Sequence, residues 1–339
     1  MYIRRDAGIA IRLFAIVLFI ATGLTSKLAH SQCEPLWQPF DSTTASLSGT
    51  NGTVFATTMW DPDGPGPQTS KLVVAGDFTI AGNAVAHELA SYDPVTGNWA
   101  PLVAGMTGSV FAFTTLPNGD LIVGGFFSSV GGVSANNIAR LNAATGQWTP
   151  LGSGVNAGVV ALTTLPNGDV VAGGNFIFAG GVSAFCIARW NPTSGQWSPL
   201  GAGMNDNVNA ITTLPNGDLI VGGDFTTAGG VSANRVARWS PLTEQWSPLG
   251  GGVNAEVLAL TTLANGELVA GGLFTTADGA TANRIARWSS LNGQWAPMGS
   301  GLNAEVRALT TLPSGELVAG GFFTTADGAT ANRVARWNP

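Results

Sequence analysis

Charged side chains are scarce in this chain: only 10% of its 339 residues are Asp, Glu, Lys or Arg, against roughly 25% in an average globular protein. Tyrosine, histidine and cysteine are rarer still, with two residues of each. Glycine, by contrast, occurs 47 times, and glycine weakens helix interiors. With 11 Trp and 16 Phe besides, this composition favours many short strands and tight turns over helices.

Collagen-like and disordered chains are also excluded. The glycines follow no Gly-X-Y period, and a hydrophobic content of 45% is enough to build a core. The chain length allows either one large all-β domain or two ordinary domains.

The N-terminus has the features of a secretory signal peptide. Basic residues precede a mostly apolar run over residues 13–24, and Ala29-His30-Ser31 is a small-x-small pattern. Such a run spans about 18 Å as a helix, less than the roughly 30 Å of a bilayer core, so cleavage is favoured over an uncleaved anchor. We therefore expect a signal peptide over residues 1–31 and a mature domain over residues 32–339. Its expected location is extracellular or periplasmic, with no membrane insertion after cleavage.

The mature domain is acidic. Without residues 1–31, the 14 basic and 20 acidic residues fall to 10 and 19, a net charge near −9. Lys71 is then the one lysine, and no basic cluster remains, which argues against nucleic acid and anionic membranes as partners. Cys33 and Cys186 fall far apart in the repeat layout described next. We expect a free structural thiol, or an intermolecular bridge at Cys33, rather than a bond between the two.

A 49-residue period runs through the chain. A W-x-P element recurs at Trp99, Trp148, Trp197, Trp246 and Trp295, and a G-G-x-F element at Phe127, Phe176, Phe225, Phe274 and Phe323. Trp37 and Phe78 extend the two series one step back, with thirteen extra residues between them. The chain therefore holds six copies of one unit, and repeats of this length are typical of stacked sheets.

One copy predicts four antiparallel strands. In the fifth copy, apolar runs over residues 257–263, 268–274, 284–288 and 294–298 are separated by turn signals, the first being Asn265-Gly266. Four strands in 40 to 50 residues match a β-propeller blade. The sequence therefore predicts an all-β fold, a six-bladed β-propeller of four-stranded antiparallel blades.

The chain ends predict how the ring closes. The mature sequence opens with a lone fourth-strand element, residues 37–40, and finishes after a third strand near residues 334–337. Pairing of these two segments would complete the sixth blade and remove open sheet edges. An open solenoid is the alternative, and it would leave both segments unpaired.

The motifs resemble those of a known family. The glycine doublet of Leu121-Ile-Val-Gly-Gly125 and the spacing of Tyr92 and Trp99 resemble kelch repeats, in all six copies. The longer pattern G-G-x-F-x-x-A-G-G-x-x-x-N-x-I-A-R-W is similar to the extracellular propellers of fungal cortical polarity-marker proteins and of bacterial exported repeat proteins. The resemblance implies a propeller fold. It implies no activity, because propellers host unrelated functions.

Several catalytic sites are excluded by residue counts. The resemblance extends to the propeller domain of galactose oxidase, whose copper-radical site needs two tyrosines and two histidines. The mature chain keeps only Tyr92 and His87. Zinc sites of the His/Cys type lack ligands for the same reason, and a Ser-His-Asp triad has only His87 as its base. No metal or cofactor is expected.

Acid–arginine pairs recur in five copies. The acid opens the second strand and the arginine lies near the end of the third, so the two fall roughly opposite each other. The first copy has lost both together, with Lys71 and Ser91 in their places. We predict five cross-strand salt bridges: Asp120 with Arg140, Asp169 with Arg189, Asp218 with Arg238, Glu267 with Arg287, and Glu316 with Arg336.

Functional variation is expected where the copies differ. The loops that lead from a fourth strand to the next first strand share one face with the loops between strands two and three. Just before the innermost strands, and in the same loops, stand polar side chains that could bind sugar hydroxyls, a cation or a basic peptide: Thr53, Ser109, Asn207, Glu256, Glu305, Asn156, Asp206, Asn254 and Asn303.

The function predicted is therefore a secreted, non-enzymatic binding or structural module. Its ligand, a glycan, peptide or protein, would bind on the loop face around the central channel. Solvated loop residues without a ligand remain an alternative reading of the rim. A second alternative is a carbohydrate-active enzyme, because Glu256 and Glu305 on adjacent blades could act as acid and base if suitably spaced.

Overall fold

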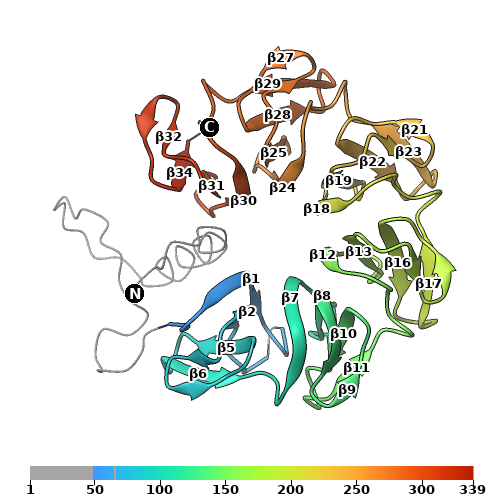
Figure 1. Cartoon of the computed structure of the whole chain (residues 1–339), viewed down its shortest axis with the longest axis vertical. Coiled ribbons are helices and arrows are strands. Elements are labelled where there is room, and N and C mark those ends of the chain that lie inside the picture. The colour runs from blue at the N-terminus through green and yellow to red at the C-terminus, as the bar shows by residue number, and fades with distance from the viewer. Residues whose placement is uncertain (1–48, 65, 339) are drawn as a thin grey trace.

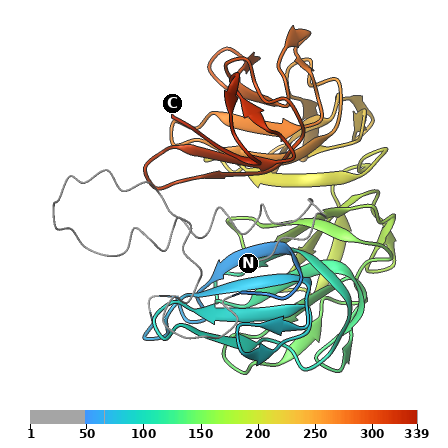
Figure 2. The ribbon, with the colours of Figure 1, turned by 60° about the vertical axis from the view of Figure 1, so that its left-hand side comes forward.

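The computed structural model describes residues 49–64 and 66–338, and all regular structure in these ranges is β-strand (Figure 1). The strands form six blades around a central axis, a six-bladed β-propeller. The first and sixth blades are neighbours in the ring in both views (Figures 1 and 2). The predicted signal peptide, Cys33 and the predicted closing strand 37–40 lie outside the described residues, so ring closure by the N-terminal strand stays a prediction.

Each blade is an antiparallel meander whose strands follow chain order from the axis outward. The first blade contains β1 (Thr53–Trp60), β2 (Lys71–Asp77), β5 (Leu89–Asp93) and β6 (Asn98–Pro101). The second contains β7 (Met106–Thr115), β8 (Leu121–Val130), β10 (Ile138–Leu141) and β11 (Trp148–Pro150). The third contains β12 (Val159–Thr164), β13 (Val170–Gly174), β16 (Ile187–Asn191) and β17 (Gln196–Pro199).

The last three blades repeat this order. The fourth contains β18 (Val208–Thr213), β19 (Leu219–Gly223), β22 (Val236–Ser240) and β23 (Gln245–Pro248). The fifth contains β24 (Val257–Thr262), β25 (Leu268–Gly272), β28 (Ile285–Ser289) and β29 (Gln294–Pro297), all within two residues of the predicted bounds. The described strands of the sixth sheet are β30 (Val306–Thr311), β31 (Leu317–Gly321) and β34 (Val334–Trp337).

Small hairpins decorate the loops between the second and third strands, where the sequence predicts only a Gly/Ala/Thr loop. They are β3 (Ile80–Ala81) with β4 (Ala84–Val85), β14 (Phe178–Ala179) with β15 (Val182–Ser183), β20 (Thr227–Ala228) with β21 (Val231–Ser232), β26 (Thr276–Ala277) with β27 (Ala280–Thr281), and β32 (Thr325–Ala326) with β33 (Ala329–Thr330). In the second blade, β9 (Val133–Ser134) pairs directly with the extended β8.

The glycine doublet allows the innermost strands to pack closely. In the third blade, a Cβ on Gly173 would lie 2.4 Å from the Val208 side chain of the next blade, and one on Gly174 would lie 2.0 Å from the carbonyl oxygen of Gly158. No larger side chain fits at either place. The first strand also carries a β-bulge opposite the doublet, and such a bulge changes the direction of its side chains.

The core lies between blades. Most of the buried apolar clusters combine residues of two consecutive blades, as where Leu219 and Trp246 of the fourth blade meet Ile187 and Leu200 of the third. The buried fourth-strand tryptophans also form hydrogen bonds between blades: the indole Nε1 of Trp197 donates to the Leu151 carbonyl at 2.8 Å, and that of Trp246 to the Leu200 carbonyl at 2.9 Å. Adjacent blades are therefore joined by both apolar and polar contacts.

Candidate functional site

The rim positions predicted from the sequence lie at or near the starts of the innermost strands, and none of them lines the channel cavity. In the last four blades, the residue before the innermost strand is held through its backbone by the residue after the glycine doublet. The equivalent residues of the first two blades, Thr53 and Ser109, lie within β1 and β7. The backbone carbonyls are the acceptors: that of Asn207 accepts from Asp224 N–H at 3.0 Å, that of Glu256 from Leu273 N–H at 2.9 Å, and that of Glu305 from Phe322 N–H at 3.0 Å. The backbone is thus common to these four blades, and only the side chains differ.

The loop asparagines have a structural role that the sequence analysis did not foresee. Asn156 Oδ1 accepts hydrogen bonds from the N–H groups of Ile177 and Phe178, both at 2.9 Å. The same pair of hydrogen bonds recurs at the equivalent residues of other copies, namely Asn51, Asn205, Asn254 and Asn303. These amide oxygens clamp one loop to the other, and they are therefore already engaged. Of the predicted rim, the side chains of Asn207, Glu256 and Glu305 remain the stronger ligand candidates.

The fourth blade carries a carboxylate held by amides. Asn209 Nδ2 donates to Asp224 Oδ1 at 2.8 Å, and Asn207 Nδ2 donates to Asp224 Oδ2 at 3.2 Å. Arg235 Nη1 donates to the Asp224 backbone carbonyl. In the preceding loop, Asp206 caps its neighbour by accepting the N–H of Asn207 at 2.8 Å. The carboxylate of Asp224, which the sequence analysis missed, is thus positioned at the channel mouth.

The sixth blade carries a cluster of charge and aromatic surface. Arg307 Nε lies 2.9 Å from Glu305 Oε1. The guanidinium carbons of Arg307 and Arg333 lie 5.0 and 5.4 Å from the ring centroid of Phe322, both within cation–π distance. This cluster has two positive charges and one negative charge. Comparison of the copies pointed to Glu305, but Arg307 and Phe322 went unnoticed because their positions vary between copies and so belong to no motif.

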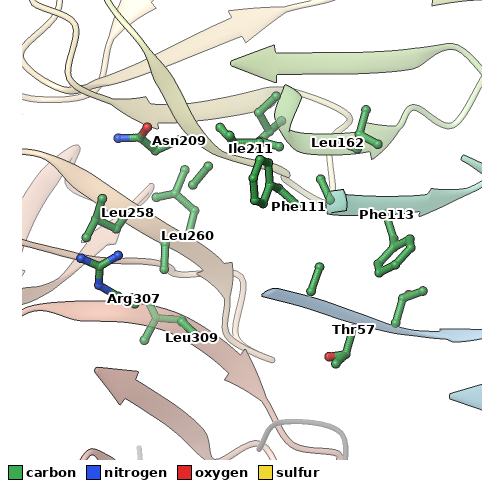
Figure 3. Close-up of a pocket in the computed structure, with 18 of the residues that line it drawn as sticks. Thr57, Phe111, Phe113, Leu162, Asn209, Ile211, Leu258, Leu260, Arg307 and Leu309 are labelled. Atoms are coloured by element: carbon green, nitrogen blue, oxygen red, sulfur yellow. The ribbon is translucent and has the colours of Figure 1, made fainter. Parts of the chain in front are cut away.

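The central channel is a cavity of about 520 Å³ lined by the innermost strands of all six blades (Figure 3). Most of the side chains that line it are apolar, with Phe111, Leu162, Ile211 and Leu260 among them. Phe111 packs edge-on against Phe55 with ring centroids 5.4 Å apart. The rim carboxylates Glu256 and Glu305 do not line this cavity. An acid–base pair at the base of a concave pocket, the geometry that the enzyme alternative requires, is therefore not formed by these two residues.

One loop-face position has a left-handed backbone in every copy. Its φ angle is positive although the residue is never glycine: Glu88, Asn137, Cys186, Arg235, Arg284 and Arg333. Its N–H and carbonyl both bond within the loop, as where Cys186 N–H donates to the Phe176 carbonyl and the Cys186 carbonyl accepts from Gly174 N–H. The sequence analysis did not predict this conformation, because hydrogen bonds of the folded loop impose it.

Two members of this series have shifted pKa values. Burial raises the pKa of the Glu88 carboxyl above its ordinary value; the nearby His87 opposes the shift, and Asp77 adds to it. Burial, with a smaller effect of the Asp206 charge, raises the pKa of the Cys186 thiol to about 11. Cys186 is free and buried, so its thiol is a structural group rather than a nucleophile.

The five acid–arginine pairs join the start of the second strand to the third strand of their blades, and none of these residues lines the channel cavity. Arg140 Nε is 2.6 Å from Asp120 Oδ2, and Arg189 Nε is 3.7 Å from Asp169 Oδ2. Arg238 contacts Asp218 closely, and the last two pairs, Arg287 with Glu267 and Arg336 with Glu316, both lie at 3.3 Å. The acids also accept hydrogen bonds from side chains of the turn, as Asp120 does from Asn118 Nδ2 at 2.9 Å. Each pair thus holds the hairpin turn as well as the third strand.

An apolar patch is exposed on the loops of the third blade. Phe185 is 48% exposed and Phe178 43% exposed, with Ile177 and Val182 beside them in sequence, and Phe126 of the second blade is 65% exposed. The other copies have Thr, Ser, Ile, Asn or His at the positions of Phe178 and Phe185. The loop face therefore differs between blades in apolar character as well as in charge.

No group of three or more His, Cys, Asp and Glu side chains in residues 49–64 and 66–338 could hold a metal ion. None of the described elements is a helix long and apolar enough to cross a membrane.

The fold and its loop-face rim define a β-propeller of repeated blades. The profile of the Rax2 C-terminal beta propeller domain matches residues 39–166, 150–247 and 199–310, so the chain belongs to this family, as the resemblance in the motifs implied. A beta-propeller domain of unknown function, DUF5122, matches residues 312–339. A search of curated proteins found no match.

Two solved structures share the fold. The extracellular domain assigned to the one component system BT4673 of B. thetaiotaomicron is 12% identical with a TM-score of 0.54, over 79% of this chain and 30% of that one. The extracellular domain assigned to the hybrid two component system BT3049 of the same organism is 13% identical with a TM-score of 0.55, over 87% and 34%. The chain thus spans about a third of the length of either structure.

Proposed function

We propose that the protein is a secreted, non-enzymatic binding or structural module whose ligand, a glycan, peptide or protein, binds on the loop face around the central channel. The observation that carries the proposal is the contrast between a repeated backbone and unrepeated rim side chains. At the residue before the innermost strand, the same backbone hydrogen bond presents Asn207, Glu256 and Glu305 on consecutive blades. A purely structural ring would not need this variation.

The loop face around the channel offers both hydrogen-bond acceptors and hydrogen-bond donors. The carboxylate of Asp224, held by two amides, is an acceptor of fixed position, and Arg333 beside Phe322 adds a donor and an aromatic face. Sugars and peptides are recognised by such combinations of a few placed polar groups with aromatic surface. An extracellular location agrees with the solved relatives, which are extracellular domains.

The carbohydrate-active alternative is weaker on the geometry. Glu305 is ion-paired with Arg307 at 2.9 Å, and a general acid would have to leave that pair to hold a proton. Neither Glu256 nor Glu305 lines the cavity. No specific observation favours catalysis.

The proposal is tested by screening residues 32–339 on glycan and peptide arrays. Any hit is then titrated against the double variant Glu256→Gln with Glu305→Gln, and against Glu244→Gln as the matched control, because Glu244 lies in an exposed turn on the opposite face. We expect loss of binding in the double variant alone. Arrays without any binder, or equal loss in Glu244→Gln, would overturn the proposal.

A further inference from the structure

The central channel carries a single charge in an otherwise uncharged wall. Of the described residues that line the 520 Å³ cavity, only Arg307 has a charged side chain. It occupies the bulge position of the innermost strand, where the other five blades have Phe55, Phe111, Val160, Asn209 and Leu258.

The blade itself does not require this arginine. The five other innermost strands form the same bulge and pair in the same register with an apolar or amide side chain. A departure from the repeat that serves no packing need of the blade points to a ligand.

The guanidinium is held with one edge available. Arg307 Nε donates to Glu305 Oε1 at 2.9 Å, and the plane lies against Phe322. Among the described residues, neither Nη group has a hydrogen-bond acceptor, and the Arg307 side chain is 44% exposed. The two Nη groups of such a fixed fork match the geometry of a carboxylate.

A second arginine contacts the same aromatic ring as Arg307. Arg333 lies against the same Phe322 ring, so the cluster holds two guanidinium groups, of which Arg307 is paired with Glu305. The surrounding wall contains Leu258, Leu260 and Leu309 (Figure 3). Attraction between an anion and a guanidinium is stronger beside apolar walls than in bulk water.

We propose that the central channel binds a small organic anion with an apolar body. Its carboxylate pairs with the Nη groups of Arg307, and its body lies along the wall that includes Phe111 and Leu258. A cavity of 520 Å³ falls within the range of about 300–1,000 Å³ that is usual for small-molecule sites. This site goes beyond the proposed rim function, because its ligand enters the channel instead of lying across the loops.

The test is calorimetric titration of residues 32–339 with naphthylacetate. Two matched probes separate the contributions: naphthylacetamide keeps the body without the charge, and acetate keeps the charge without the body. We expect saturable binding of naphthylacetate alone, at one site. Arg307→Gln should weaken it by about tenfold or more, as the loss of a charge-assisted pair requires. Arg336→Gln, which removes an ion-paired arginine of an outer strand, should bind as the wild type does.

Arg307→Lys is the second variant, because it keeps the positive charge and loses the fork. We expect intermediate affinity from it, and weaker binding of naphthylacetate to the wild type at high salt. No saturable binding, equal binding of the amide, or unchanged affinity in Arg307→Gln would overturn the proposal. A rim ligand found on the arrays would survive that result, and naphthylacetate binding would survive empty arrays, so the two proposals fail separately.

Discussion

The indole Nε1 of Trp197 donates a hydrogen bond to the backbone carbonyl of Leu151, 2.8 Å away, and so ties the third blade to the second. Trp190, opposite it on the neighbouring strand, is equally buried, but its indole nitrogen has no partner among the described residues. Two tryptophans in one blade thus differ in a single hydrogen bond.

This difference predicts unequal effects of the same substitution. Trp197→Phe and Trp190→Phe remove similar volume, but only the first removes an inter-blade bond, so it should lower the free energy of unfolding by about 1 kcal/mol more. Denaturant unfolding of both variants measures the difference. Equal destabilisation would show that the bond contributes nothing.

The Asp120–Arg140 pair should contribute more to the free energy of unfolding than the Glu316–Arg336 pair of the sixth blade does. Asp120 is 1% exposed and also accepts bonds from Asn118 Nδ2 and the Ala143 N–H. We expect Asp120→Asn to cost about 1.5–3 kcal/mol. Glu316→Gln breaks a pair whose arginine is largely exposed and should cost about 0.2–1 kcal/mol. Chemical denaturation checks both values, and the reverse order would refute the argument from burial.

Phe185→Asn should stabilise the protein. The other copies with Asn here use its Nδ2 to bind a carbonyl of the following loop, as Asn234 does with Gly251 at 2.9 Å and Asn283 with Ser300 at 3.0 Å. Restoring that bond should add about 1 kcal/mol. Phe178→Thr removes another exposed aromatic without offering the bond, and should change stability by less than about 0.5 kcal/mol. A melting temperature for Phe185→Asn no higher than that of the control would contradict the prediction.

Because the pKa of the Cys186 thiol is raised in the folded protein, we expect the protein to lose stability at alkaline pH. The folded pKa of the thiol is raised to about 11 from an ordinary value of 9.0, so the unfolded chain loses this proton first. The contribution of the thiol is therefore complete below pH 9 and is lost as the pH rises toward 11. Unfolding of the Cys33→Ser variant across this range should show the decline, and Cys33→Ser with Cys186→Ala should show less of it. Identical pH profiles would contradict the assignment.

The sequence predicted the framework well because six copies repeat it. Blade number, strand order and most strand bounds follow from apolar runs and turn signals that recur every 49 residues, and averaging over copies removes local ambiguity. The short hairpin β14–β15 was missed because two-residue strands leave no periodicity. Closure through Trp37 stays a prediction.

The site was less predictable for the opposite reason. Arg307, Phe322 and Asp224 each occur at positions that differ between copies, so no repeat marks them. Asn156 and Asn303 seemed free to bind ligands because a sequence does not show which side-chain oxygens the backbone already uses. Only the tertiary contacts show whether an asparagine holds two loops together or is available to a ligand.

Hydrogen–deuterium exchange with the strongest array ligand tests the central claim most directly, because it locates binding on the ring. The account predicts protection in peptides that contain residues 202–208, 251–257 and 300–307, with no change in the turns around Gly168 and Glu244. Protection confined to those turns, or no protection at the channel mouth in the presence of a bound ligand, would contradict it.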